Sequence, residues 1–555
     1  MRAVEAVRVR LLDFRAMVIA THDVRNQVPS LFPHDLFSEN RPLAEGLDRE
    51  GAGWARERAE ELGVLTGGDP IRWGFEANEH APRLRTHDRW GNRVDEVDFH
   101  PSWHALMATA SEHGLHCLPW ENDRPGAHVA RAALTMTWGQ CEAGHRCPVT
   151  MTFAAVPALR VEPRVADEWV PRLLARAYDP ELRADKASAK CGMAMTEKQG
   201  GSDVRANTTQ AELLGDDDWY ALTGHKWFCS APMCDLFLIL AQIPEGITCF
   251  ALPRVLPDGE RNAGFQIQRL KEKLGNRSNA SSEVEFQGAL AQRVGEPGRG
   301  VPTIIGMVGH TRLDCVIGTT TNMRLAVAHA THHAAHRSVF GKPLIDQPLM
   351  QQVLADLCIE SEAATLSALR LARAYDEGDR AFVRLGTAVL KYWVCKRGPA
   401  HAGEALEVLG GNGYVEESGQ PRIYREQPLN SVWEGSGNVM CLDVLRGLAK
   451  EPALLGGWFD ELDEARGTDP RYDTFVAGLR DEFADLEDVE RRARRVVEKL
   501  ALAMQGSLLV RHGLPASADA FCAGRLAGDA GLAFGTLPPG IDARAIVEHH
   551  RPHVG

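Results

Sequence analysis

The sequence of 555 residues lacks any run of 18 or more apolar residues, so we expect no transmembrane helix. Its first 23 residues are rich in Arg, but acidic residues interrupt them and they lack the continuous apolar core of a signal peptide. We interpret this stretch as upstream or mistranslated sequence. The 12 cysteines include no Cys-x-x-Cys pair and follow no regular spacing. Because scattered cysteines are typical of free thiols in a reducing compartment, we expect a cytoplasmic protein.

Two common phosphate-binding motifs are also absent. No Gly-x-Gly-x-x-Gly follows a predicted strand, and no Gly-x-x-x-x-Gly-Lys-Ser/Thr loop occurs. A nucleotide cofactor, if there is one, is therefore held by another kind of loop. Positive charge is in deficit: the net charge is -13 and the pI is about 5.9. This balance argues against a protein that binds polyanions with its whole surface, although a local basic patch can still exist.

Composition and periodicity divide the chain into four regions. We predict a helical region over residues 1–190, an antiparallel β domain over 191–300, a four-helix bundle over 301–449 and a further helical domain over 450–555. Hydrophobic residues make up 44% of the chain and charged residues 25%, which is typical of a globular protein.

Long periodic segments predict the bundle helices. Residues 302–337, 346–375 and 381–410 each predict a helix of about 40 Å or more, and a fourth helix is expected to begin near Asn438. Residues 29–43 show no period and contain many turn formers, so we expect an extended segment that packs against another part of the protein.

The segment MTEKQGGSDV, residues 195–204, lies where the helical region gives way to the β region. Its paired glycines let the backbone approach a planar or anionic ligand, and the hydroxyls of Thr196 and Ser202 can hydrogen-bond to that ligand. An ordinary turn is the alternative interpretation.

Glu434 lies in a Trp-Glu-Gly-Ser-Gly loop ahead of an apolar helix, which Ser436 or Asn438 can cap. A carboxylate beside Trp433 and glycines can have a raised pKa and act as a base. The alternative is an ordinary carboxylate in a surface loop.

Four histidines, His329, His332, His333 and His336, share one face of a predicted helix, and His-x-x-x-His spacing can bind zinc. No Glu follows the first His as in His-Glu-x-x-His, so we prefer a polar face near the helix C-terminus, where cationic side chains are favourable. The cluster CEAGHRC, residues 141–147, has no distant partner pair. We expect no bound metal.

The last region carries charge of both signs. Residues 451–490 contain 3 basic and 13 acidic residues, whereas residues 491–500 contain 5 basic and 1 acidic residue. Arg491, Arg495 and Lys499 fall on one helical face. That face can bind phosphates or pair with the acidic run before it.

Six motifs in one order resemble the acyl-CoA dehydrogenase family: TEKQGGSD, GHKWF, TRLD, RSVFGKPL, EVLGGNGY and WEGSGN. The resemblance covers residues 190–449 closely, and MTEKQGGSDV, KLGNRSNAS and NSVWEGSGNVMCLDVLR are similar to its AidB branch, flavoproteins of the alkylation response. It implies a mainly α fold with an N-terminal helical domain, a middle antiparallel β-barrel-like domain and a four-helix bundle. The AidB branch adds a C-terminal helical domain and forms a homotetramer.

The resemblance also implies FAD between the β domain and the bundle. Arg337 and Phe340 match residues that reach the adenine half from a neighbouring subunit, and Gly410 and Gly411 match glycines beside the pyrophosphate. The residues that match flavin-binding positions are Met195, Thr196, Gly201, Ser202, Phe228, Cys229, Ser230, Arg337, Phe340, Gly410, Gly411, Trp433, Gly435, Ser436, Gly437 and Asn438.

By the same resemblance, Glu434 matches the catalytic base, which takes the α-proton of an acyl thioester while a hydride passes from the β-carbon to the flavin. The family usually has Tyr-Glu-Gly here, and the larger ring of Trp433 can narrow the acyl pocket. Arg312 matches a bundle arginine of the family.

AidB-type proteins are also associated with double-stranded DNA, and Arg446 matches a DNA-facing arginine of that branch. Three hypotheses therefore stay open. The first is a DNA-associated flavoprotein that protects or repairs DNA under alkylation stress and has weak dehydrogenase activity. The second is an ordinary acyl-CoA dehydrogenase that acts on short or branched acyl-CoA. The third is a non-enzymatic, flavin-stabilised DNA-binding protein.

Overall fold

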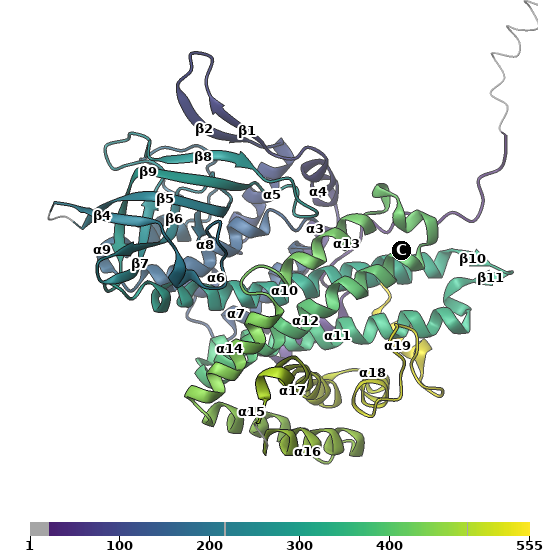
Figure 1. Cartoon of the computed structure of the whole chain (residues 1–555). Coiled ribbons are helices and arrows are strands. Elements are labelled where there is room, and N and C mark those ends of the chain that lie inside the picture. The colour runs from purple at the N-terminus through teal and green to yellow at the C-terminus, as the bar shows by residue number, and fades with distance from the viewer. Residues whose placement is uncertain (1–20, 216–217, 485–486, 555) are drawn as a thin grey trace, which may run out of the picture.

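The computed structural model describes residues 21–215, 218–484 and 487–554. Most of the Arg-rich start, residues 1–20, lies outside the described residues. Within the described chain, one β domain occupies the upper left of Figure 1, and the long helices lie to its right and below it. None of the helices in these residues is long and apolar enough to cross a membrane.

The N-terminal region consists mainly of helices. Before the first of them, residues 29–40 have no regular structure and bury Leu31, Leu36 and Phe37, as expected of the packed segment predicted over 29–43, but its last three residues already belong to the first helix. The helices are α2 (Arg41–Arg49), α3 (Arg56–Thr66), α4 (Asp69–Glu79), α5 (Pro101–Glu112), α6 (Leu118–Glu121), α7 (Ala127–Trp138), α8 (Arg146–Leu159) and α9 (Pro163–Leu174). An unexpected antiparallel hairpin, β1 (Arg83–His87) and β2 (Arg93–Asp98), projects from the top of the molecule (Figure 1).

Seven strands form the β domain. They are β3 (Cys191–Ala194), β4 (Gln210–Leu214), β5 (Trp219–Ser230), β6 (Leu236–Ile243), β7 (Gly246–Pro253), β8 (Phe265–Leu270) and β9 (Ser281–Val294). Their order is β3-β6-β4-β5-β9-β7, β8 pairs with β9, and β6 also pairs with β7, so the sheet closes on itself like a barrel. Most pairs are antiparallel, as expected, but β3 and β4 both run parallel to β6. Phe237, Phe250 and Phe286 fill the interior.

The bundle begins with three long helices, α10 (Gly300–His336), α11 (Pro348–Glu377) and α12 (Arg380–Val408). Each predicted segment lies within two residues of the observed helix at both ends. Two shorter helices follow, α13 (Gln420–Asn430) and α14 (Gly437–Lys450), and both pack on α12. The break between them places the Glu434 loop against the middle of the bundle.

The C-terminal helices share one hydrophobic core with the bundle and with α2–α7. They are α15 (Ala453–Asp463), α16 (Pro470–Ala484), α17 (Val489–His512), α18 (Pro515–Phe521) and α19 (Ala543–His550). The Gly/Pro-rich stretch before α19 is anchored, because Gly535 N–H donates to Asp356 at 2.9 Å and the His550 ring bonds Glu362 at 2.9 Å. By contrast, α8 and α9 belong to the β-domain core.

Candidate active site

Glu434 lies in the loop between α13 and α14. Its φ of 58° and the φ of 101° at Gly435 both lie in the left-handed region. A residue with a side chain in this region costs about 1–3 kcal/mol, so surrounding contacts must hold the loop in this shape.

Two cationic side chains of the bundle hold that loop. Arg312 of α10 donates from Nε to the carbonyl oxygen of Glu434 at 3.0 Å. Lys391 of α12 donates from Nζ to the carbonyl oxygens of Trp433, at 2.8 Å, and of Gly435. Because both cations bond the backbone, they fix the loop without capturing the carboxylate itself.

The Glu434 carboxylate accepts a hydrogen bond from Thr311 Oγ1 at 2.6 Å. Burial raises the pKa of Glu434, and the Thr311 hydroxyl and the charges of Arg312 and Lys391 only partly oppose that rise. A carboxylate with a raised pKa and a fixed direction is suited to act as a general base.

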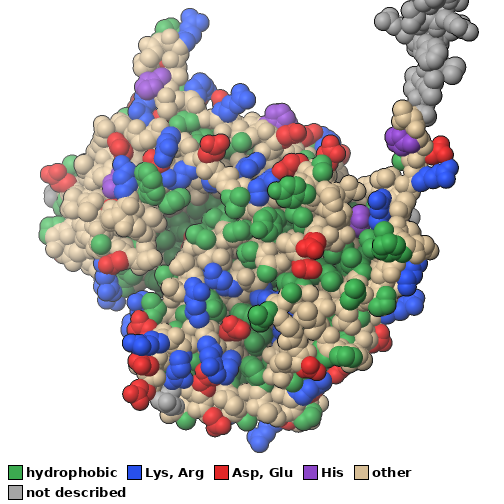
Figure 2. Space-filling model, turned by 45° about the vertical axis from the view of Figure 1, so that its right-hand side comes forward, with side chains coloured by type: hydrophobic (Ala, Val, Ile, Leu, Met, Phe, Trp, Pro, Cys, Tyr) green, Lys and Arg blue, Asp and Glu red, His purple; other side chains and the backbone are tan. Residues whose placement is uncertain are grey.

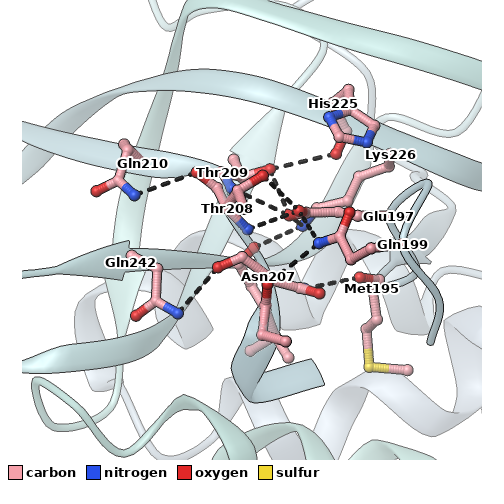
Figure 3. Close-up of polar contacts among 12 residues, drawn as sticks. Met195, Glu197, Gln199, Asn207, Thr208, Thr209, Gln210, His225, Lys226 and Gln242 are labelled. Carbon is pink, nitrogen blue, oxygen red and sulfur yellow. Dashed lines mark hydrogen bonds and ion pairs between the residues drawn. The ribbon is translucent and has the colours of Figure 1, made fainter. Parts of the chain in front are cut away.

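The predicted flavin residues after β3 are fastened to β5. The Trp227 N–H donates to the carbonyl oxygen of Thr196 at 2.8 Å, and the Asn207 side chain donates to that of Met195 at 2.8 Å (Figure 3). A Cβ on Gly201 would come within 2.3 Å of the Thr196 hydroxyl, so only glycine fits there. Ser202 is exposed at the tip of the same loop.

The three predicted residues of β5 differ in burial. Phe228 is 50% exposed and Ser230 is half-buried, whereas the side chain of Cys229 is fully buried in the β-domain core. Cys229 can therefore face a flavin only through its backbone, and Phe228 offers a ring on which a planar ligand can stack.

Cys147 of α8 is buried in the β-domain core. Burial raises the pKa of its thiol to about 12; the side chains of Asn279 and Ser230 oppose the rise, and the charge of Glu434 adds to it. Both polar atoms of the Asn279 side chain are buried without a hydrogen-bond partner in the described chain. An isoalloxazine ring carries nitrogen and oxygen atoms along one edge that can supply those partners. The residues present therefore fit FAD, and Figure 2 shows hydrophobic side chains lining a hollow at the left of the molecule, below the β1–β2 hairpin.

Four predicted cofactor residues lie at the opposite end of the bundle: Arg337, Phe340, Gly410 and Gly411. The helix α10 separates Thr311 from Arg337 by about 39 Å at 1.5 Å per residue. Phe340 is 98% exposed at the tip of the hairpin β10 (Ser338–Val339) and β11 (Lys342–Pro343), far from the β domain (Figure 1). Arg337 donates to the carbonyl oxygen of Asn26 at 2.5 Å. One chain alone thus does not bring these residues to Glu434.

The start of α14 also carries predicted residues. Ser436 precedes the helix, but its side chain makes no capping hydrogen bond. A Cβ on Gly437 would lie 2.9 Å from the Lys396 side chain and 3.3 Å from the Tyr392 ring, so the start of α14 packs closely on α12. Asn438 accepts a hydrogen bond from Arg494 of α17 at 2.8 Å. Arg446 is exposed further along α14 and has no hydrogen-bond or ion-pair partner among the described residues.

The histidine face is not the solvated polar face that the sequence suggested. His332 bonds the carbonyl oxygen of Pro29 at 2.9 Å, and the His329 ring lies 5.7 Å from that of Phe32. Burial lowers the pKa of His329 to about 3 and that of His333 to about 4, so both are neutral. Within the part of the chain that the structure covers, no three His, Cys, Asp or Glu side chains are close enough to hold a metal ion.

Sequence reasoning missed three residues of this site: Thr311, Lys391 and Asn279. Thr311 opens the TRLD motif and Asn279 lies in the KLGNRSNAS motif, so both motifs marked the right segments without showing which side chain matters. Lys391 lies in a buried helix and carried no signal, because its partners are backbone oxygens about 40 residues away in the chain.

Comparisons with known proteins agree with this architecture. Residues 26–180 match the model of the adaptive response protein AidB N-terminal domain, residues 192–289 that of the acyl-CoA dehydrogenase middle domain, and residues 298–449 that of the acyl-CoA dehydrogenase C-terminal domain. AidB of Escherichia coli (strain K12), named as an acyl-CoA dehydrogenase, is 45% identical over 511 residues, which cover 90% of this chain and 94% of that protein.

Solved structures show the same fold. Caenorhabditis elegans ACDH-11 in complex with C11-CoA superposes with a TM-score of 0.84 at 25% identity, over 97% of this chain and 95% of that one. A Mycobacterium smegmatis glutaryl-CoA dehydrogenase in complex with FADH2 superposes with a TM-score of 0.56 at 19% identity, over 76% of this chain and 96% of that one. The flavin expected from the sequence is bound, as FADH2, in that glutaryl-CoA dehydrogenase. The chain belongs to the acyl-CoA dehydrogenase family, within its AidB branch.

Proposed function

We propose that this protein is an FAD-dependent acyl-CoA dehydrogenase in which Glu434 takes the α-proton of an acyl thioester. The observation that carries the proposal is the Glu434 carboxylate, held by Thr311 and given a raised pKa by burial. When bound, FAD accepts the hydride from the β-carbon. The complex of ACDH-11 with C11-CoA supports an acyl-CoA as the ligand.

The surrounding residues prepare the proton transfer. Arg312 and Lys391 keep the loop in its left-handed shape, so the carboxylate does not have to reorganise when the thioester binds. The indole N–H of Trp433 donates to Asn430 at 3.0 Å, which fixes the ring beside the β-domain core. By the family resemblance this large ring can narrow the acyl pocket, so we expect short or branched acyl chains to react better than long straight ones.

Two measurements test this proposal. The purified protein should bind FAD, and an acyl-CoA should bleach the flavin in the absence of oxygen. Comparing the bleaching caused by a short, a branched and a C11 acyl-CoA shows which acyl chains fit beside Trp433. A protein that FAD cannot reconstitute contradicts the proposal, and bound FAD that no acyl-CoA reduces favours the non-enzymatic hypothesis.

Thr311→Val should move the acid limb of the pH profile of flavin reduction to higher pH. The base must be deprotonated, and the Thr311 hydroxyl lowers the pKa of Glu434, so its removal raises that pKa further. The profile is measured by anaerobic stopped-flow reduction at saturating acyl-CoA. Thr331→Val is the control, because its hydroxyl bonds the carbonyl oxygens of Val327 and Ala328 within α10 and lies far from Glu434. An unmoved acid limb would show that Glu434 is not the titrating base.

We further propose that this protein binds double-stranded DNA under alkylation stress, through the exposed face of α14 that carries Arg446. The guanidinium of Arg446, which is exposed and has no polar partner among the described residues, supports this second function. The basic face of α17 contributes less, since Arg495 and Lys499 both pair with Glu482. Charges of both signs mix over the lower part of Figure 2, where the C-terminal helices lie, so binding should be local.

Arg446→Ala should weaken DNA binding for all sequences alike and lower the slope of log affinity against log salt by about one unit, as the loss of one phosphate contact does. Fluorescence anisotropy over a salt series measures both quantities, and flavin content should not change. Arg480→Ala is the matched control, because Arg480 already pairs with Asp463. If the wild-type protein shows no salt-dependent DNA binding, the DNA-binding proposal is wrong and the hypothesis of an ordinary acyl-CoA dehydrogenase remains.

We also propose that copies of this chain assemble into a homotetramer. Phe340, Leu349 and Tyr414 are each more than 80% exposed at the end of the bundle that carries Arg337 and Gly410. Apolar side chains gathered in this way mark an interface, and a homotetramer would bring the four distant cofactor residues to a neighbouring flavin. Size-exclusion chromatography with light scattering measures the assembly.

A further inference from the structure

The loop that carries the predicted flavin residues Thr196, Gly201 and Ser202 is closed at its base by side chains. Its two ends meet where the Asn207 amide donates to the Met195 carbonyl oxygen at 2.8 Å. The Gln242 amide of β6 donates to the carbonyl oxygens of Asn207 and Arg205, at 3.0 and 3.1 Å. The tip of the loop, around Gly200, is exposed.

Glu197 is the centre of this closure (Figure 3). One carboxylate oxygen accepts from the Thr208 N–H, the Thr208 hydroxyl and the Gln199 amide at 2.6, 3.0 and 2.8 Å. The other accepts from the Thr209 N–H, the Thr209 hydroxyl and Lys226 Nζ at 3.1, 2.6 and 2.7 Å. Six donors converge on one carboxylate whose side chain has no exposed surface.

Lys226 joins the loop to the strand that carries Phe228. Its ammonium donates to Glu197 and to the carbonyl oxygen of Leu240 at 2.8 Å, and its side chain is also fully buried. The next residue, Trp227, donates its N–H to the Thr196 carbonyl oxygen at 2.8 Å. The ion pair and this backbone bond therefore fix Thr196 relative to Phe228.

Stability alone does not require an ion pair here, because well-packed apolar side chains of similar volume would serve as well or better in a buried position. What a hydrogen-bonded carboxylate adds is direction, since each of its six bonds fixes one donor. The closure lies one residue from Thr196 and two residues from Phe228.

We propose that the Glu197–Lys226 pair positions the flavin, by holding Thr196 and Phe228 in the one arrangement in which both meet the same isoalloxazine ring. The inference rests on the proposed FAD binding. Glu197 and Lys226 are positioning residues, because they act through Thr196 and Phe228 and are too buried to touch the cofactor.

Glu197→Gln tests the role, since glutamine keeps the shape but removes the charge and turns one acceptor into a donor. We expect the FAD dissociation constant to rise by about tenfold or more, as the loss of a hydrogen bond to a charged group predicts. The visible absorption band of the remaining bound flavin should shift toward that of free FAD. Hydrogen exchange of the Thr208 and Thr209 amides in FAD-free protein should quicken.

Lys186→Met is the matched control, because Lys186 and Asp235 form a buried ion pair of the same β domain at the other end of β3. It should lower thermal stability without changing FAD affinity or the band, when both are measured well below the unfolding temperature. Equal loss of affinity in both variants, or none in Glu197→Gln, would overturn the positioning role alone. Wild-type protein that binds no FAD would overturn the proposed function and the inference with it.

Discussion

Glu434→Gln is expected to lower acyl-CoA-dependent flavin reduction by about 10⁴-fold, at the upper end of what removing a general base costs. Glutamine keeps the length and the contact with Thr311 but cannot take the α-proton. Burial raises the pKa of this carboxylate, and the amide that replaces it has no comparable basicity. Anaerobic stopped-flow reduction by a saturating acyl-CoA measures the rate.

Three comparisons make this result specific. FAD content and DNA affinity of Glu434→Gln should equal those of the wild type, because neither depends on proton transfer. Glu417→Gln, at an exposed position after α12, should keep full activity. If Glu434→Gln reduces its flavin at the wild-type rate, another group is the base and the role assigned to Glu434 is wrong.

The fold could be predicted from the sequence because its elements are long and their patterns are local. The segments 302–337, 346–375 and 381–410 alternate apolar and polar residues over eight or more helical turns, and the observed α10, α11 and α12 agree with them. The β1–β2 hairpin escaped prediction because its strands are short and charged, and only Leu84 and Val97 pack on the β-domain core.

The site was predicted only where one segment contains the whole signal. Motifs located Thr196, Phe228 and Glu434, but whether they bind FAD and move a proton awaits experiment. Lys391 could not be assigned, because its role depends on a loop that folds back from a distant part of the chain.

The prediction for the four histidines was wrong for a related reason. Helical periodicity showed that His329, His332, His333 and His336 share a face, but not what covers it. The covering segment, which contains Pro29 and Phe32, lies about 300 residues earlier in the sequence. Burial lowers the pKa of His329, His332 and His333 and so penalises their charged form, whereas His336 is exposed at the end of the helix.

Asp314→Asn is expected to cost about 3–5 kcal/mol of unfolding free energy, the usual cost of removing one partner from a buried ion pair. Asp314 of α10 receives both terminal nitrogens of the Arg131 guanidinium at 2.7 Å, and the Thr150 hydroxyl donates to it at 2.5 Å. Both members of the pair are at most 3% exposed. The substitution leaves the Arg131 charge uncompensated where α7, α8 and α10 meet, and urea unfolding measures the loss.

The pH dependence of the free energy of unfolding distinguishes the loss of this ion pair from a packing defect. Burial alone would raise the pKa of Asp314, but Arg131 and Thr150 hold it below its usual value. A carboxyl whose pKa is lower in the folded state stabilises the protein above its unfolded pKa and loses that contribution as pH falls. The difference between wild type and Asp314→Asn should therefore shrink in acid, whereas a packing defect would keep it constant. Asp463→Asn, which breaks the half-exposed pair with Arg480, should change stability by less than about 1 kcal/mol at any pH.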